Sequence, residues 1–260
     1  MADEPELVVQ DTADELAEEV ALRVLATLAT AQQQHGRAAL ALTAGSIMEK
    51  TWAALAATAA RNNVDWAAVD VFWADERYVA SDSADRNDGP AREILFAKAP
   101  FTLAELYPMP ATDSSYPDLD AAAAGYAERL AGARRPDDSD DVPNFDVVLL
   151  GVGPDGHCAS LFPGHPGLSD DSSTVIAVRD SPKPPPDRIS LSFRGLAAAN
   201  EIWFVASGTG KADAVARAWS GLDFTEVPSA RPRGRQRTLW LVDADAASKL
   251  PSDTVANSTS

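Results

Sequence analysis

The chain has 260 residues, 45% of them hydrophobic, which is enough to bury one full core. Its formal net charge of -17 argues against nucleic acid and anionic membrane surfaces as partners, because both require a basic face. An anionic small ligand would have to be held by locally placed cations. The single cysteine, Cys158, excludes internal disulfides and fits a reducing compartment. The acidic opening MADEPEL lacks the apolar stretch of a signal peptide, and no run approaches the ~20 apolar residues of a membrane span, so a cytoplasmic protein is predicted.

Helices and strands alternate along the first half of the chain. Thr12 and Glu15 have the spacing of a capping box, which predicts a helix from there to about residue 31. The segments predicted next are a strand at 38–42, a helix at 46–60, a strand at 69–73, a helix at 90–96 and a helix at 118–133. Residues 134–144, RRPDDSDDVPN, are too polar for a core element and predict a solvated connector.

The second half continues the same pattern. Predicted strands are 145–150, 175–178, 188–192, 201–206 and 238–242, with a helix at 211–219. This alternation implies an α/β fold, doubly wound, with a mainly parallel sheet and helices on both faces. Residues 1–250 are expected to form one such domain, favoured as a monomer, and residues 251–260 a disordered tail.

Four polar segments follow four of the predicted strands. They are TAGS at 43–46, ADER at 74–77, GVGPDGH at 151–157 and SGTGK at 207–211. Because the carboxyl ends of parallel strands lie along one edge of a sheet, where ligands bind, these segments are predicted to meet in one crevice.

The third segment also matches a dinucleotide-binding fingerprint, through Gly151, Gly153 and Gly156. However, Pro154 and the anionic Asp155 occupy positions where a pyrophosphate needs free N–H groups and positive potential. No cofactor is therefore expected.

Metal and nucleophile chemistries are also weakly supported. His157, Cys158 and His165 do not have the spacing of a zinc site, so no metal is expected. Ser160 lies close to His157 but outside any G-x-S-x-G nucleophile elbow, so direct attack by water is the simpler interpretation. Four arginines in the segment RPRGRQR are expected on a solvated face, with one of them able to reach the crevice: Arg231, Arg233, Arg235 and Arg237.

The stretch LLGVGPDGHCASLFPGHP resembles the signature of the 6-phosphogluconolactonases, hydrolases of the oxidative pentose phosphate pathway. Similar to this family, in the same order, are the Thr-Ala-Gly-Ser turn, WADERYV with Asn87 after it, SPKPPPDRIS and SGTGKADAV. The chain departs from the family at Ala44, where a second glycine is usual. If that backbone needs a positive φ or a close approach to phosphate, alanine is strained; otherwise the change is harmless.

A δ-lactone with a 6-phosphate requires an anion cradle, a base that activates water and donors for the oxyanion. For the phosphate, Gly45 and Ser46 supply N–H groups and a hydroxyl at a helix N-terminus, and Lys211 supplies a charge. The alternative is that Gly45 is a turn residue and Ser46 a helix cap. Further substrate contacts are expected from one carboxylate and two guanidinium groups: Asp75, Arg77 and Arg188. Arg77 has an alternative in an ion pair with Asp75 or Glu76.

His157 is the predicted general base, because an imidazole can hold or release a proton near neutral pH. Asp155 either orients His157 or only closes the turn. The other two histidines, His35 and His165, lie in polar or Pro/Gly-rich loops and are expected to be structural.

Two other functions are compatible with the same crevice. The first is the aldose–ketose isomerase and deaminase chemistry of glucosamine-6-phosphate deaminases, which the resemblance implies share the fold. Those enzymes carry an Asn-Glu pair after Asp-Gly-His, whereas this chain has Leu161 and Phe162, which cannot titrate. The second is a non-catalytic sugar-phosphate sensor, which has no need of a base at position 157.

Overall fold

The computed structural model describes residues 4–58, 63–98, 100–256 and 258. Its strands are β1 (Glu6–Gln10), β2 (Ala38–Leu42), β3 (Val69–Trp73), β4 (Asp75–Arg77), β5 (Glu105–Tyr107), β6 (Val147–Gly151), β7 (Val175–Val178), β8 (Arg188–Leu191), β9 (Glu201–Ala206) and β10 (Arg237–Asp243). Its α-helices are α1 (Ala13–His35), α2 (Ser46–Thr58), α3 (Asp88–Ala91), α4 (Leu119–Gly132), α5 (Phe193–Leu196), α6 (Ala212–Trp219), α7 (Ala244–Ala247) and α8 (Ser252–Ala256). The last two residues of the helix predicted at 46–60 lie outside the described residues.

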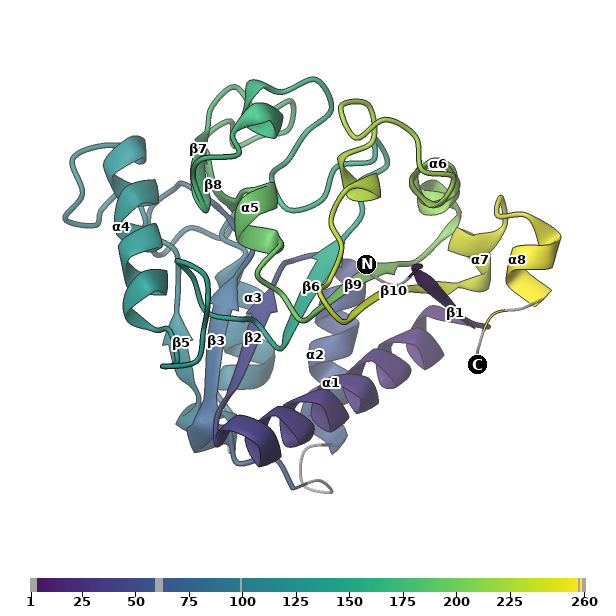
Figure 1. Cartoon of the computed structure of the whole chain (residues 1–260), viewed down its shortest axis with the longest axis horizontal. Helices are drawn as coiled ribbons and strands as arrows, with labels where there is room; N and C mark the ends of the chain where they lie inside the picture. Colours follow the sequence, from purple (N-terminus) through teal and green to yellow (C-terminus); the bar gives the residue numbers. More distant parts are fainter. Residues whose placement is uncertain (1–3, 59–62, 99, 257, 259–260) are drawn as a thin grey trace.

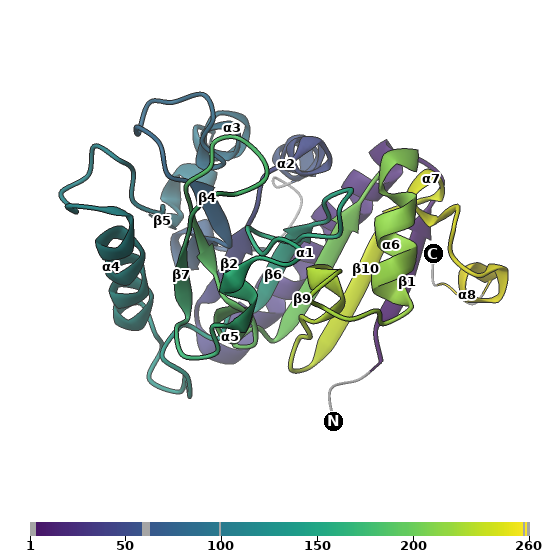
Figure 2. The ribbon, with the colours of Figure 1, turned by 90° about the horizontal axis from the view of Figure 1, so that it is seen from above.

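Seven strands form one sheet in the order β1-β10-β9-β6-β2-β3-β5, and every neighbouring pair is parallel. In Figure 1, β9 and β10 lie between α1 below and α6 above. Helices α1 and α2 pack against each other beside the sheet (Figures 1 and 2). This arrangement confirms the predicted α/β fold with a mainly parallel sheet. Strand order runs outward from β2 in one direction and from β6 in the other, so the topological switch point lies between these two strands.

Helix α1 shows how local sequence builds this frame. The Thr12 hydroxyl accepts the Glu15 N–H at 3.2 Å, and the Glu15 carboxylate accepts the Thr12 N–H at 3.0 Å, which is the predicted capping box. The helix continues to His35, four residues beyond the prediction, and ends where Gly36 adopts a φ of 77°. Its apolar side is buried against the sheet and α2 through Leu16, Val20, Val24 and Leu28.

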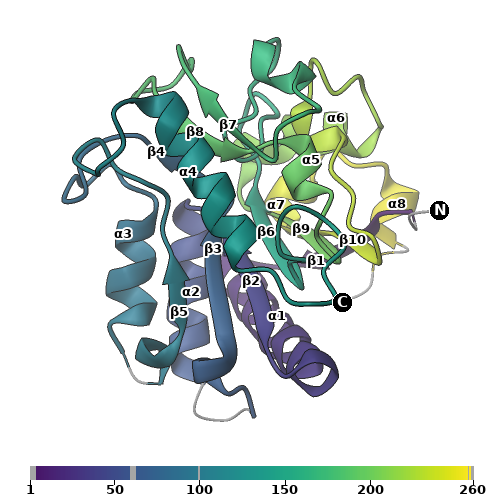
Figure 3. The same ribbon diagram turned by 60° about the vertical axis from the view of Figure 1, so that its left-hand side comes forward.

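A second, antiparallel sheet of three strands, in the order β4-β8-β7, lies beside the first. The strands predicted at 175–178 and 188–192 form β7 and β8 of this small sheet and therefore do not extend the parallel one. Its third strand, β4, is the ADER segment, predicted only as a polar loop. Helix α4 packs across β7 and β8, as Figure 3 shows. The small sheet forms one wall of the site described below.

Other differences concern short elements. Strands β1 and β5 at the two sheet edges were not predicted, because β1 has polar residues at both ends and only two buried ones, and β5 has only three residues. The helix predicted at 90–96 begins at Asp88 and continues as a π-helical turn, Arg92–Phe96. Residues 252–256 form α8, where the sequence predicts a disordered tail. Among the described residues, no helix is both long and apolar enough to span a membrane.

Candidate functional site

A crevice of about 260 Å³ opens at the carboxyl ends of four neighbouring strands, β9, β6, β2 and β3. All four polar segments predicted to meet there line it, together with the loop before β8. The lining residues are Thr43, Ala44, Gly45, Ser46, Ile47, Asp75, Arg77, Asn87, Gly151, Val152, Gly153, Pro154, His157, Ala159, Lys183, Arg188, Val205, Ala206, Ser207 and Lys211. The crevice spans the topological switch point, the usual ligand site of an open α/β sheet.

The N-terminus of α2 lines the crevice and offers a site for an anion. Gly45, with a φ of 140°, leads into Ser46 at the first turn of α2, and both residues are exposed. Helix N-termini present free N–H groups and favour negative charge. Ala44 is not among the described non-glycine residues with positive φ, so the positive φ of this turn falls on Gly45 and the departure from the family pattern causes no backbone strain.

Lys211 faces the same space from the turn before α6. The turn is held from below, since the carboxylate of Asp243 accepts the Gly208 N–H at 2.9 Å and the Ser207 hydroxyl at 2.5 Å. Within the described part of the chain, the Lys211 ammonium has no hydrogen-bond or carboxylate partner. Burial and the nearby charge of Lys183 lower the pKa of Lys211, and Asp155 opposes this effect. A half-buried ammonium without a counterion is suited to an anionic ligand.

His157 lines the same crevice. Its Nδ1 is 2.5 Å from Asp155 Oδ1, and the ring packs against Phe162 with centroids 4.6 Å apart. Burial raises the pKa of the Asp155 carboxyl, but the hydrogen bond and charge of His157 and the charge of Lys183 outweigh it and hold the pKa well below its usual range. Asp155 therefore remains an anion that fixes the imidazole through Nδ1. The other ring nitrogen, Nε2, has no partner among the residues that the structure describes.

Lys183 completes this group and was missed as a site residue, although it belongs to the SPKPPPDRIS segment quoted for the family resemblance. Its ammonium lies 3.2 Å from Asp155 Oδ1 and 3.1 Å from His157 Nδ1. It approaches from the loop before β8, and no local pattern marks it, because the residue reaches His157 only through the tertiary fold.

Arg188 holds that loop. Its guanidinium donates to three carbonyl oxygens of the loop, those of Pro185 at 3.0 Å, Lys183 at 3.1 Å and Pro184 at 3.2 Å. Its role in the structure is therefore to shape the loop that carries Lys183, and it also lines the crevice.

Arg77 and Asp75 lie on β4, in the same small sheet as Arg188, and Arg77 is the register partner of Arg188. Arg77 donates to the Asp85 carbonyl oxygen at 2.6 Å, and the described salt bridges include none between Arg77 and Asp75 or Glu76. The alternative ion pair is thus not formed. Asp75 is 3% exposed, and its two oxygens accept the hydroxyls of Thr43 at 2.9 Å and Ser160 at 2.7 Å.

The charges of the crevice oppose those of the whole protein. Its four cationic side chains, Lys183, Lys211, Arg77 and Arg188, face two carboxylates, Asp75 and Asp155, which leaves a local charge of +2 in a chain of net charge -17. These are the locally placed cations that an anionic ligand requires in an acidic protein.

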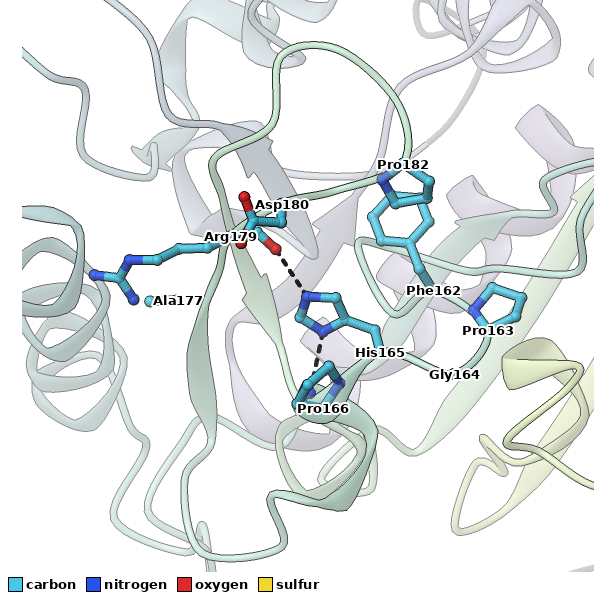
Figure 4. A pocket seen from close by; sticks show the side chains of 10 residues that line it. Phe162, Pro163, Gly164, His165, Pro166, Ala177, Arg179, Asp180 and Pro182 are labelled. Carbon is cyan, nitrogen blue, oxygen red and sulfur yellow. Dashed lines mark hydrogen bonds between the residues drawn. The ribbon is translucent and has the colours of Figure 1, made fainter.

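The remaining candidates have structural roles. His165 accepts the Gly167 N–H on Nδ1 at 3.0 Å, and its Nε2 is 2.9 Å from the Arg179 carbonyl oxygen, so both ring nitrogens are occupied (Figure 4). It lines a separate cavity of about 550 Å³, whose walls also include three prolines, Phe162, Arg179 and Asp180. His35 pairs with Asp137. Burial raises the pKa of the Cys158 thiol, which makes it unreactive.

None of the four clustered arginines lines the crevice. Arg231, Arg235 and Arg237 pair with Asp171, Asp140 and Glu201, and Arg233 donates to the Pro232 carbonyl oxygen. No group of three or more His, Cys, Asp or Glu side chains in the described ranges is placed to hold a metal ion.

Fold and site together define an α/β protein with a crevice of net positive charge, lined by one imidazole, at the carboxyl ends of its parallel strands. Residues 11–240 match the model of a family described as glucosamine-6-phosphate isomerases/6-phosphogluconolactonase. The chain belongs to this family.

The 6-phosphogluconolactonase of Streptomyces coelicolor is 46% identical over 252 residues, which cover 96% of this chain and 97% of that protein. The 6-phosphogluconolactonase of Mycobacterium tuberculosis is 44% identical over 231 residues, covering 88% and 92%. Among solved structures, the 6-phosphogluconolactonase of Trypanosoma brucei superposes with a TM-score of 0.79 at 27% identity and covers 96% of this chain and 100% of its own.

Proposed function

We propose that this protein hydrolyses 6-phospho-D-glucono-1,5-lactone to 6-phospho-D-gluconate, the lactonase reaction of the oxidative pentose phosphate pathway. The observation that carries the proposal is that one crevice is lined by the unpaired Lys211, by the N-terminus of α2 and by His157, whose ring is paired with Asp155. The proteins of Streptomyces coelicolor and Mycobacterium tuberculosis named above are 6-phosphogluconolactonases, which supports this assignment. We also propose that the protein acts in the cytoplasm as a monomer.

In the mechanism, the 6-phosphate binds at Ser46 and Lys211, and this fixes the lactone carbonyl near His157. Asp155 accepts a hydrogen bond from Nδ1–H, which leaves Nε2 without a proton and able to take one from water. The hydroxide formed attacks the carbonyl carbon, and the oxyanion that develops is stabilised by the nearby Lys183 ammonium. The bond from that carbon to the ring oxygen then breaks, and His157 returns the proton to the departing oxygen. A carboxylic acid and an alcohol result, and the acid then loses its proton to solvent to give the carboxylate.

Deaminase chemistry is disfavoured by the residues after the Asp-Gly-His turn. Leu161 and Phe162 are both 1% exposed and apolar, so they supply no titrating group to the crevice. We therefore expect no release of ammonia from glucosamine 6-phosphate.

Replacement of the base tests the assignment. His157→Ala should lower kcat by ~10²-fold or more with little change in KM, because a general base contributes to the transition state and little to ground-state binding. The rate of lactone opening must be measured against the spontaneous hydrolysis of the substrate. A variant with wild-type turnover would show that His157 is not the base, and a wild-type protein that binds 6-phosphogluconate without any turnover would favour a sensor.

A further inference from the structure

Ser160 connects the loop that carries His157 to the small sheet that forms one wall of the crevice. Its side chain is fully buried, and its hydroxyl donates to Asp75 Oδ2 at 2.7 Å. Its backbone N–H donates to the Ser190 hydroxyl at 3.2 Å. Asp75 and Ser190 face each other in the register of β4 and β8, so Ser160 is anchored at one point of the small sheet.

The chain between His157 and Ser160 is strained. Ala159, which lines the crevice, has a φ of 47°, a left-handed conformation that a non-glycine residue adopts only when its surroundings impose it. The turn is closed by the Leu161 N–H, which donates to the Cys158 carbonyl oxygen at 3.0 Å. The anchor at Ser160 lies immediately after this strained residue and is therefore placed to maintain it.

The Asp75 carboxylate also contacts the turn at residues 43–46 that precedes α2. Asp75 Oδ1 accepts the Thr43 hydroxyl at 2.9 Å, and Thr43 begins the turn that leads through Gly45 to Ser46. Asp75 has no salt bridge among the described residues; its carboxylate accepts these two hydroxyls, and its carbonyl oxygen accepts the Asn87 side-chain amide at 3.0 Å.

We propose that Ser160 is a positioning residue for the lactonase reaction: through Asp75 it holds the strained turn that places His157, while Thr43 uses the other oxygen of the same carboxylate to place the anion cradle. This inference rests on the proposed function. Ser160 is then not a nucleophile, because its hydroxyl is buried and donates its hydrogen bond to Asp75. The two hydroxyls are expected to affect different kinetic constants.

The test compares two variants of the full-length protein in the lactonase assay. Ser160→Ala should lower kcat by about 10- to 100-fold and leave KM within about twofold, because it displaces the base and leaves the phosphate site intact. Thr43→Val should raise KM by about 3- to 10-fold with kcat nearly unchanged, because it loosens the cradle. The matched control is Ser192→Ala, a fully buried serine that accepts the Gly195 N–H at 3.1 Å and lies outside the crevice. It should change neither constant.

The outcomes are separable. The positioning role would be overturned if folded Ser160→Ala has the kcat of the wild-type protein. It would also be overturned if Ser160→Ala and Thr43→Val change KM by the same factor. An inactive wild-type protein would instead overturn the proposed function. If Ser160→Ala does not fold, Ser160→Cys, which keeps the size but has a weak donor, is measured for the same loss of kcat at constant KM. The imidazole resonances of His157 should shift in the Ser160 variant and remain unchanged in Ser192→Ala.

Discussion

Gly153 offers the sharpest test of the geometry around His157, because one added methyl group disturbs the base without removing any functional group. A Cβ built at Gly153 would overlap the His157 ring and the Asp155 carboxylate. The backbone there is not in the positive-φ region, so alanine meets no conformational penalty of its own. To restore an ordinary contact of roughly 3.4 Å, the imidazole must move by more than about 1 Å.

A displacement of that size in a reacting group is expected to cost ~10² in rate, which corresponds to about 2.7 kcal/mol of transition-state stabilisation. Gly153→Ala should therefore lower kcat about 100-fold, measured by single-turnover hydrolysis of the lactone. The control is Gly132→Ala, since a Cβ at Gly132, in α4, meets nothing within 4 Å. Turnover of Gly153→Ala within about twofold of wild type, at an unchanged unfolding midpoint, would refute the geometry.

Two further predictions concern charge. Lys211→Met should raise KM by about 10- to 100-fold with kcat nearly unchanged, because a charge-assisted hydrogen bond to phosphate contributes ~1.5–3 kcal/mol. Steady-state kinetics measure both constants. An unchanged KM would show that the phosphate does not bind at Lys211. Burial raises the pKa of Glu76 to about 7, whereas the pKa of a glutamate in an unfolded chain is ~4.3. Between these two pH values the folded protein binds more protons than the unfolded protein. The free energy of unfolding therefore falls as the pH rises from ~4.3 to about 7. Urea unfolding measures the free energy of unfolding at pH 5 and at pH 8. The decrease between these two pH values should be smaller in Glu76→Gln than in the wild-type protein, and equal decreases would contradict the raised pKa.

Much of the frame could be predicted from local sequence. Strands β2, β3, β7 and β9 begin and end at the predicted residues, because apolar runs of four to six residues between turn residues are too short for most helices and favour buried strands. Strand β4 could not be predicted in this way. Its three residues, Asp75, Glu76 and Arg77, are charged, and two of them are buried because the rest of the fold supplies their partners. Glu76, for example, accepts the N–H groups of Asn87 and Asp88 at 2.6 and 3.0 Å.

The sequence by itself determined the doubly wound architecture and the four polar segments at one sheet edge, since hydrophobic periodicity and glycine-rich turns are local properties of the chain. It also singled out His157 and left open whether Asp155 orients that ring or only closes the turn, and the structure shows the carboxylate paired with Nδ1. Only the tertiary structure decided which distant groups join them. Lys183 reaches His157 from 26 residues away, and Ser160 reaches Asp75 across 85. Such contacts depend on how β4, β8 and the loop after β6 pack together, and no local pattern in the sequence encodes that packing.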